Sequence, residues 1–193
     1  MGNAAGAATL PRYHAAQRLI HWVVAVLAVI TLAMGLTLGS LGVEGARALF
    51  GVTATNLLYT SHKTCGVLML GLMVLRVVFR VTLGKPGYAH PLPMFQRVAS
   101  EVVHGALYLL LLAMPVLGWL ATAAGDFPVA FFHYELPRLI GTNEALSEQL
   151  YAWHGAVGLT VLGLIVLHVA AALYHWRIRR DGVMQRMSLF RPK

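Results

Sequence analysis

The chain has 193 residues, of which 58% are hydrophobic and only 11% are charged. A typical soluble domain carries about 25% charged residues, so this composition excludes an ordinary soluble globular protein. The formal net charge of +8 comes from basic residues beside apolar stretches, without a nucleic-acid-binding motif, so we expect no nucleic-acid partner. We expect a single membrane domain over residues 1–193, with lipid as its surroundings.

Four long apolar stretches follow one another along the chain, at approximately residues 19–39, 61–82, 102–124 and 151–176. Each has the roughly 20 residues that a helix needs to cross about 30 Å of hydrocarbon. The first stretch is longer than the roughly 7–15 residues of a signal-peptide core, so we expect it to be retained. The sequence therefore predicts an all-α membrane protein, a bundle of four transmembrane helices.

The distribution of charge predicts the orientation. Most of the 15 Lys and Arg residues lie before the first stretch, between the second and third, or after the fourth. The other two connections carry mostly acids, so the positive-inside rule places both termini in the cytoplasm. The basic tail from Arg177 to Lys193 has interspersed apolar residues, and we expect it to lie on the inner leaflet as an amphipathic segment.

Histidines inside the apolar stretches are the strongest functional signal. An intramembrane imidazole is costly without a partner, and imidazole is a common axial ligand of haem iron. His168 follows His154 by 14 residues, which places the two within roughly 40° on one helix face and about 21 Å apart. That face can serve two haems at two depths. His62 is the outer-side candidate on another helix, so we expect His62 to pair with His154.

The inner partner of His168 stays open on spacing alone. His21, near the start of the first stretch, and His104, early in the third, lie at similar depths. A membrane histidine can also hydrogen-bond a backbone carbonyl or a hydroxyl without binding a metal.

The other residues around these histidines indicate how a haem would be held. No CxxCH motif surrounds the single cysteine, Cys65, so any haem is expected to be noncovalent, of b type. Gly66 and Gly158 each follow a histidine by four residues, on the same helix face. They either leave room for a porphyrin or serve ordinary helix packing. Arg76 and Arg80 either pair with haem propionates or anchor the helix at the inner surface.

The chain resembles the bacterial cytochrome b561 family, which is related to the cytochrome b subunits of nickel–iron hydrogenases. The resemblance covers almost the full length and rests on Ile20-His21-Trp22, His62 with Cys65-Gly66, Arg76 and Arg80, Trp153-His154, His168, and His175 followed by Arg180-Asp181. It implies a four-helix bundle that encloses two haems in a bacterial inner membrane. It also implies that His21 and His168 bind the inner haem iron and that His62 and His154 bind the outer one.

The resemblance further implies a carrier that moves electrons across the membrane, to or from the quinone pool, with ubiquinone as the expected substrate. Some members are thought to oxidise superoxide, which would make this chain a superoxide:ubiquinone oxidoreductase with a periplasmic donor. Lys63 adds a cation beside His62, although the outer connections are net acidic. One alternative is a membrane-anchor cytochrome b subunit of a periplasmic hydrogenase or dehydrogenase. Another is a histidine-lined transporter of protons or metal ions.

Overall fold

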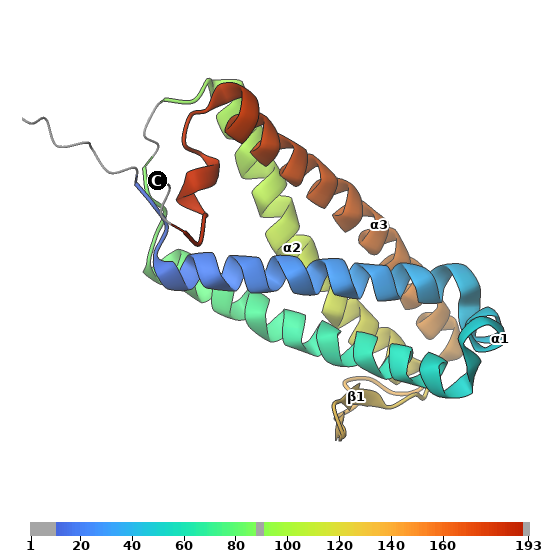
Figure 1. The fold of residues 1–193 in the computed structure, drawn as a ribbon. Coiled ribbons are helices and arrows are strands. Elements are labelled where there is room, and N and C mark those ends of the chain that lie inside the picture. Colours follow the sequence, from blue (N-terminus) through green and yellow to red (C-terminus); the bar gives the residue numbers. More distant parts are fainter. Residues whose placement is uncertain (1–10, 88–90, 191–193) are drawn as a thin grey trace, which may run out of the picture.

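A computed structural model describes residues 11–87 and 91–190 of the chain. It consists of long helices, one small hairpin and two short helical turns (Figure 1). In chain order these are α1 (Ala15–Thr82), α2 (Met94–Ala124), β1 (Val129–Phe131), β2 (Tyr134–Leu136), α3 (Glu144–Tyr174), the π-helical turn η1 (His175–Arg179) and the 3₁₀ turn η2 (Met184–Arg186).

The helix α1 is folded back on itself. Its backbone leaves the helical conformation at Gly42 (φ 64°) and Gly51 (φ 80°), in the region of positive φ that glycine adopts without steric cost. Residues 15–41, the first arm, and residues 52–82, the second arm, therefore run side by side (Figure 1). The side chain of Gln17 donates to the carbonyl oxygens of Phe79 and Gly84, each at 3.0 Å, and ties the beginning of one arm to the end of the other.

The helices extend beyond the apolar stretches that the sequence displays. His14 and Gln17 form a capping box at the start of α1, and the side chain of Asn143 caps α3 by accepting from the Leu146 amide at 3.0 Å. Such capping moves the start of each helix to polar residues outside the expected hydrocarbon. Consequently His62 and His154 lie a few turns inside their helices and not at the first residues.

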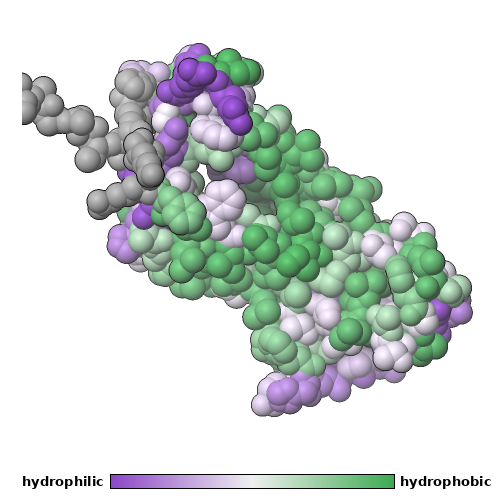
Figure 2. Space-filling model, in the orientation of Figure 1, coloured by the Kyte–Doolittle hydropathy of each residue, from purple (hydrophilic) through white to green (hydrophobic). Residues whose placement is uncertain are grey.

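The surface of the bundle is apolar along its middle. Three helices in the described part of the chain are long and apolar enough to cross a membrane: Ala15–Thr82, Met94–Ala124 and Glu144–Arg179. Hydrophobic side chains cover the middle of the molecule, and hydrophilic ones gather at its two ends (Figure 2). This pattern is typical of a protein whose solvent is lipid, since lipid gives apolar side chains no reason to turn inward.

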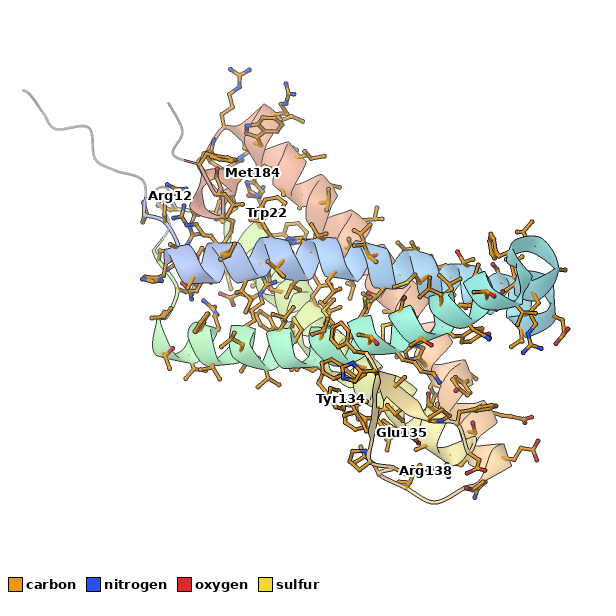
Figure 3. All side chains as sticks on the ribbon, turned by 60° about the horizontal axis from the view of Figure 1, so that its bottom comes forward. Arg12, Trp22, Tyr134, Glu135, Arg138 and Met184 are labelled. Carbon is orange, nitrogen blue, oxygen red and sulfur yellow. The ribbon has the colours of Figure 1, made fainter. Side chains whose placement is uncertain are left out.

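One end of the bundle, here called the hairpin end, carries the β1–β2 hairpin and the junction of the two arms. Val129 pairs with Leu136 and Phe131 with Tyr134 in an antiparallel register. The Lys63 ammonium donates to the carbonyl oxygen of Pro128 at 2.9 Å, so the segment that leads into the hairpin is fastened to α1 beside His62. Figure 3 shows Tyr134, Glu135 and Arg138 on this side of the molecule.

The opposite end, here called the tail end, holds the start of α1 and the end of α3. Residues 180–190 turn back from α3 onto the beginning of α1, and we call this segment the C-terminal strap (Figure 1). Its backbone carbonyls accept hydrogen bonds from side chains of α1, which a free amphipathic helix on the leaflet would not allow. The C-terminal strap is therefore a docked, mostly irregular segment that contains the η2 turn.

An exposed ion pair fixes the loop at the hairpin end. The guanidinium of Arg138 contacts the Asp126 carboxylate, which also accepts from the Thr142 hydroxyl at 3.2 Å. The hydrogen bond and charge of Arg138 hold the pKa of Asp126 below its ordinary value. A lowered carboxyl pKa stabilises the folded loop above the unfolded-state pKa, and this contribution is lost as the pH falls through the folded-state pKa.

We therefore expect Arg138→Gln to raise the pKa of Asp126 toward its ordinary value. Carbon NMR of the labelled carboxyl, titrated in detergent, measures the shift directly. Thr142→Ala, which removes only the weaker hydrogen bond, should raise the pKa by less. Equal midpoints in Arg138→Gln and the parent protein would show that the ion pair does not form in solution.

Candidate functional site

Four intramembrane histidines meet as two pairs inside the bundle. His21 on the first arm faces His168 on α3, with ring centroids 6.2 Å apart and ring planes at 80°. His62 on the second arm faces His154 on α3, with centroids 6.0 Å apart and planes at 83°. Each pair therefore joins α1 to α3. The first pair lies toward the tail end and the second toward the hairpin end.

The spacing within each pair matches two ligands that share one metal ion. An imidazole nitrogen lies about 2 Å from its metal and about 1 Å from its ring centre, so two imidazoles on opposite sides of one ion have centres about 6 Å apart. The two pairs meet this requirement at 6.2 and 6.0 Å. Direct stacking or a hydrogen bond between the rings would bring them closer.

The hydrogen bonding of the imidazoles also suits metal ligation. His154 Nδ1 lies 3.0 Å from the carbonyl oxygen of Met114, which can only accept, so this nitrogen carries the proton and Nε2 keeps its lone pair. Among the described residues, the buried Nδ1 atoms of His21 and His62 have no hydrogen-bond partner. A buried polar atom without a partner is rare in folded proteins and calls for an additional group at the site.

His104 lies beside the pair at the tail end but in a different environment. Its ring centroid is 5.0 Å from that of His168, closer than the roughly 6 Å expected of two imidazoles on opposite sides of one ion. His104 is exposed, and its Nδ1 forms a hydrogen bond with the carbonyl oxygen of Ser100, at 2.5 Å, within α2. The geometry therefore favours His21 over His104 as the partner of His168, which residue spacing alone did not decide.

The other histidines have local roles. His14 caps α1, His133 packs on Tyr134 with ring centroids 4.0 Å apart, and His175 pairs with Asp181. His90 falls outside the described residues. In the described part of the chain, no group of three or more His, Cys, Asp or Glu side chains could hold a metal ion. An ion between two histidines would thus take its remaining ligands from a bound group such as a porphyrin.

Glycines make room around the pair at the hairpin end. Two pockets adjoin His154, and both are lined by Thr31 and Met114. Gly158 lines one of them and Gly66 lines the other, together with His62. These are the two glycines that the sequence marked, and their position beside the imidazoles is compatible with a flat ligand. Cys65, the next residue before Gly66, is half-buried.

Two further glycines approach the imidazoles directly and were missed in the sequence. A Cβ atom at Gly35 would lie 3.0 Å from Cε1 of His62, and one at Gly118 would lie 3.1 Å from Cε1 of His154. Each glycine sits on a helix segment other than that of the histidine it touches. No spacing along the chain relates them, so only the packing of the helices exposes their role.

Arginines lie at the tail end of the second arm. Arg76 donates through Nε to the Tyr108 hydroxyl at 3.2 Å, and its guanidinium lies 5.2 Å from the centre of the Tyr108 ring. The terminal nitrogen Nη1 of Arg80 is buried without a hydrogen-bond partner among the described residues. An unpartnered buried guanidinium nitrogen is suited to a carboxylate of a bound group.

A family model described as prokaryotic cytochrome b561 matches residues 12–188. The chain belongs to the prokaryotic cytochrome b561 family. It is accordingly a membrane protein that carries b-type haem and transfers electrons, which supports the cytochrome interpretation over a histidine-lined transporter. The paired imidazoles, the orphaned Nδ1 atoms and the glycines beside the rings are compatible with that group.

Curated relatives agree with the family assignment. The chain is 34% identical to cytochrome b561 homolog 2 of Escherichia coli (strain K12) over 130 residues, which are 65% of this chain and 68% of the relative. It is 25% identical to cytochrome b561 homolog 1 of the same organism over 178 residues, 91% of this chain and 96% of the relative. A protein of Yersinia pestis named "Probable superoxide oxidase CybB" is 29% identical over 127 residues, 65% of this chain and 72% of the relative.

We expect Gly35→Ala to weaken haem retention because the new methyl group displaces the imidazole of His62. Disturbing the support of a metal ligand costs about 10-fold or more in affinity. Gly39→Ala is the matched control, one helical turn further along the same arm, where a Cβ meets nothing within 4 Å. Haem-to-protein ratios and absorption spectra of the purified proteins measure the effect. Identical spectra for both variants would contradict this account of Gly35.

Proposed function

We propose that the chain binds two noncovalent b haems, one at each histidine pair. His21 and His168 ligate one iron, and His62 and His154 ligate the other. The support comes from the centroid distances of 6.2 and 6.0 Å and from the orphaned Nδ1 atoms. Gly66 and Gly158 then leave space beside the porphyrin of the second site.

The proposed domain spans residues 1–193 and crosses the membrane four times, since each arm of α1 contains one of the apolar stretches. The tail end faces the cytoplasm, because the basic residues gather there and the positive-inside rule applies. Both termini are then cytoplasmic, in the inner membrane of a bacterium. The His21–His168 pair becomes the inner site and the His62–His154 pair the outer site.

The side chains around the inner site would stabilise the acidic groups of a haem. Arg76, held by Tyr108, and Arg80, whose buried nitrogen has no partner among the described residues, lie at the tail end of the second arm and would hold the propionates of an inner haem. A guanidinium binds a carboxylate through two parallel hydrogen bonds. We assign both arginines to this role in addition to anchoring the helix at the inner surface.

A packed apolar layer lies between the two sites. It consists of a buried cluster from both arms of α1, namely Ile20, Val24, Ala28, Met69 and Met73, against which residues of α2 and α3 also pack. The two α3 ligands are 14 residues apart, which corresponds to about 21 Å of helix. This layer excludes water between the sites and fixes their separation.

The function that these features support is electron transfer between the two faces of the membrane, with the quinone pool as partner. Haem, when bound, supplies one-electron redox chemistry whose potential depends on axial ligands, burial and nearby charge. The observation that carries the proposal is the presence of two histidine pairs at two depths of one bundle. A carrier between the two faces needs a site near each of them.

Oxidation of superoxide at the outer site is a second candidate. The relative named "Probable superoxide oxidase CybB" suggests it, and Lys63 places a cation one residue from His62. A cation near a buried site raises the local concentration of an anionic reductant. The reaction would release dioxygen at the periplasmic face and pass one electron inward, toward ubiquinone.

The ligand assignment predicts that each histidine substitution removes one haem and leaves the other in place. His154→Ala should remove the outer haem and retain the inner one, and His168→Ala should do the reverse. His21→Ala should match His168→Ala, whereas His104→Ala should retain both haems because His104 bonds Ser100 within its own helix. Haem content and reduced-minus-oxidised spectra of the purified variants measure each outcome. A haem lost from His104→Ala but kept in His21→Ala would make the inner assignment wrong.

The quinone partner predicts that the isolated protein reacts with quinone by itself. We expect prereduced protein in detergent to be reoxidised by a ubiquinone analogue at a rate that rises with quinone concentration. Stopped-flow absorbance of the haem bands measures this rate. A rate that does not depend on quinone concentration would favour the anchor-subunit alternative, in which a partner protein exchanges the electrons.

A further inference from the structure

The C-terminal strap connects the two helices that carry the inner histidine pair. His168 lies on α3, the strap continues from the end of α3, and it finishes on the first arm of α1, which carries His21 (Figure 1). In Figure 3, Trp22 and Met184 lie close together at this end of the molecule, with Arg12 beside them. The strap thus links the helix that carries His168 to the helix that carries His21.

On α1, the strap is held at the turn that contains His21. The indole nitrogen of Trp22 donates to the carbonyl oxygen of Met187 at 2.9 Å. One turn earlier, the guanidinium of Arg18 donates to the carbonyl oxygen of Ser188 at 2.7 Å. The Trp22 ring also packs edge-on against the His21 ring, with centroids 5.4 Å apart. The residue next to a proposed iron ligand is therefore a main attachment point of the strap.

The middle of the strap is buried. Arg186 in η2 is only 5% exposed, donates to the carbonyl oxygen of Pro86 and lies 5.4 Å from the centre of the Tyr13 ring. The Tyr13 amide in turn donates to the Arg186 carbonyl oxygen at 3.2 Å. Charged side chains are almost never buried unless paired, so these contacts indicate a fixed position for η2 and not a loose association.

On α3, the start of the strap is fixed by Asp181. Its carboxylate accepts from His175 Nδ1 at 2.6 Å and from the Val183 amide at 3.2 Å, and it lies 3.8 Å from Arg179. His175 follows His168 by seven residues, which is nearly two full turns, so the two imidazoles project from the same side of the helix. The strap therefore leaves α3 from the face that carries the inner ligand.

We propose that the C-terminal strap is a positioning element of the inner haem site, in which Trp22, Arg18 and Asp181 hold His21 and His168 at the separation that two ligands of one iron require. This inference rests on the proposed ligand set. The axial ligands come from different helices and must be kept within a fraction of an ångström of the ligating geometry. The contacts of the strap lie at the tail end, whereas the outer pair lies toward the hairpin end, so the strap should act on the inner site.

The first test removes a single hydrogen bond of the strap. Trp22→Phe keeps an aromatic ring beside His21 and deletes the indole donor to Met187. Trp119→Phe is the matched control, because the indole of Trp119 donates to the carbonyl oxygen of Pro137 at 3.1 Å near the hairpin end. The readouts are the occupancy, the low-temperature electron paramagnetic resonance spectrum and the midpoint potential of each haem, assigned with His168→Ala and His154→Ala.

We expect Trp22→Phe to lower inner-haem affinity by about 10-fold, as for other losses of support behind a metal ligand, and to shift the inner-haem resonance and potential. The outer haem should keep its parental occupancy, spectrum and potential. Trp119→Phe should leave the inner haem unchanged. An unaltered inner haem in Trp22→Phe, or an equal change in Trp119→Phe, would overturn the proposal.

The second test acts from the strap itself and leaves the His21 turn intact. A chain that ends after Gly182 lacks the acceptors of Trp22 and Arg18 but retains the His175–Asp181 pair. It should show the same selective change as Trp22→Phe, with a fully occupied outer haem as evidence of folding. If the truncated chain fails to fold, Asp181→Asn serves the same purpose, and an inner haem with parental properties in it would overturn the proposal.

Variants of the proposed ligands distinguish a wrong ligand set from a wrong role of the strap. If His21→Ala and His168→Ala do not remove the same haem, the proposed ligand set fails, and the strap proposal fails with it. If they do remove the same haem while Trp22→Phe, the truncated chain and Asp181→Asn keep its parental properties, only the strap proposal fails.

Discussion

The structure depends on one constraint, which is that an imidazole inside an apolar bundle must have a partner. Lipid cannot hydrogen-bond His21, His62, His154 or His168, so the protein or a bound group must do so. The bundle brings an imidazole from each arm of α1 against an imidazole of α3. The antiparallel fold of α1 at Gly42 and Gly51 makes this possible, since it presents His21 and His62 at opposite ends of the same bundle.

The coarse fold and the central histidines can be predicted from the sequence, because both produce local, periodic patterns in it. Long apolar stretches show where helices cross hydrocarbon, and the 14-residue interval between His154 and His168 places both on one helix face. The helix boundaries are harder to predict. They depend on caps such as His14 and Asn143, which lie outside the apolar stretches and extend the helices into the polar regions.

The remaining features depend on packing between segments that are distant in the chain. Gly35 and Gly118 touch imidazoles on other helix segments, and nothing in their local sequence distinguishes them from the other glycines. The C-terminal strap looks amphipathic as a sequence. It is docked because donors on α1, Trp22 and Arg18, lie within reach of its carbonyls. The distances of the two rings from His168 likewise favour His21 over His104, as the family resemblance implied and as residue spacing alone did not decide.

The placement of one member of each histidine pair on α3 has a consequence for biogenesis. The two α1 histidines are synthesised early, but each lacks its opposite imidazole until α3 has left the ribosome and entered the membrane. With the proposed ligand set, cofactor insertion is therefore a late event, because neither histidine pair is complete before α3 is in place. Until then the nascent bundle holds unpaired imidazoles in lipid, so insertion of the final long helix is coupled to maturation of the whole molecule.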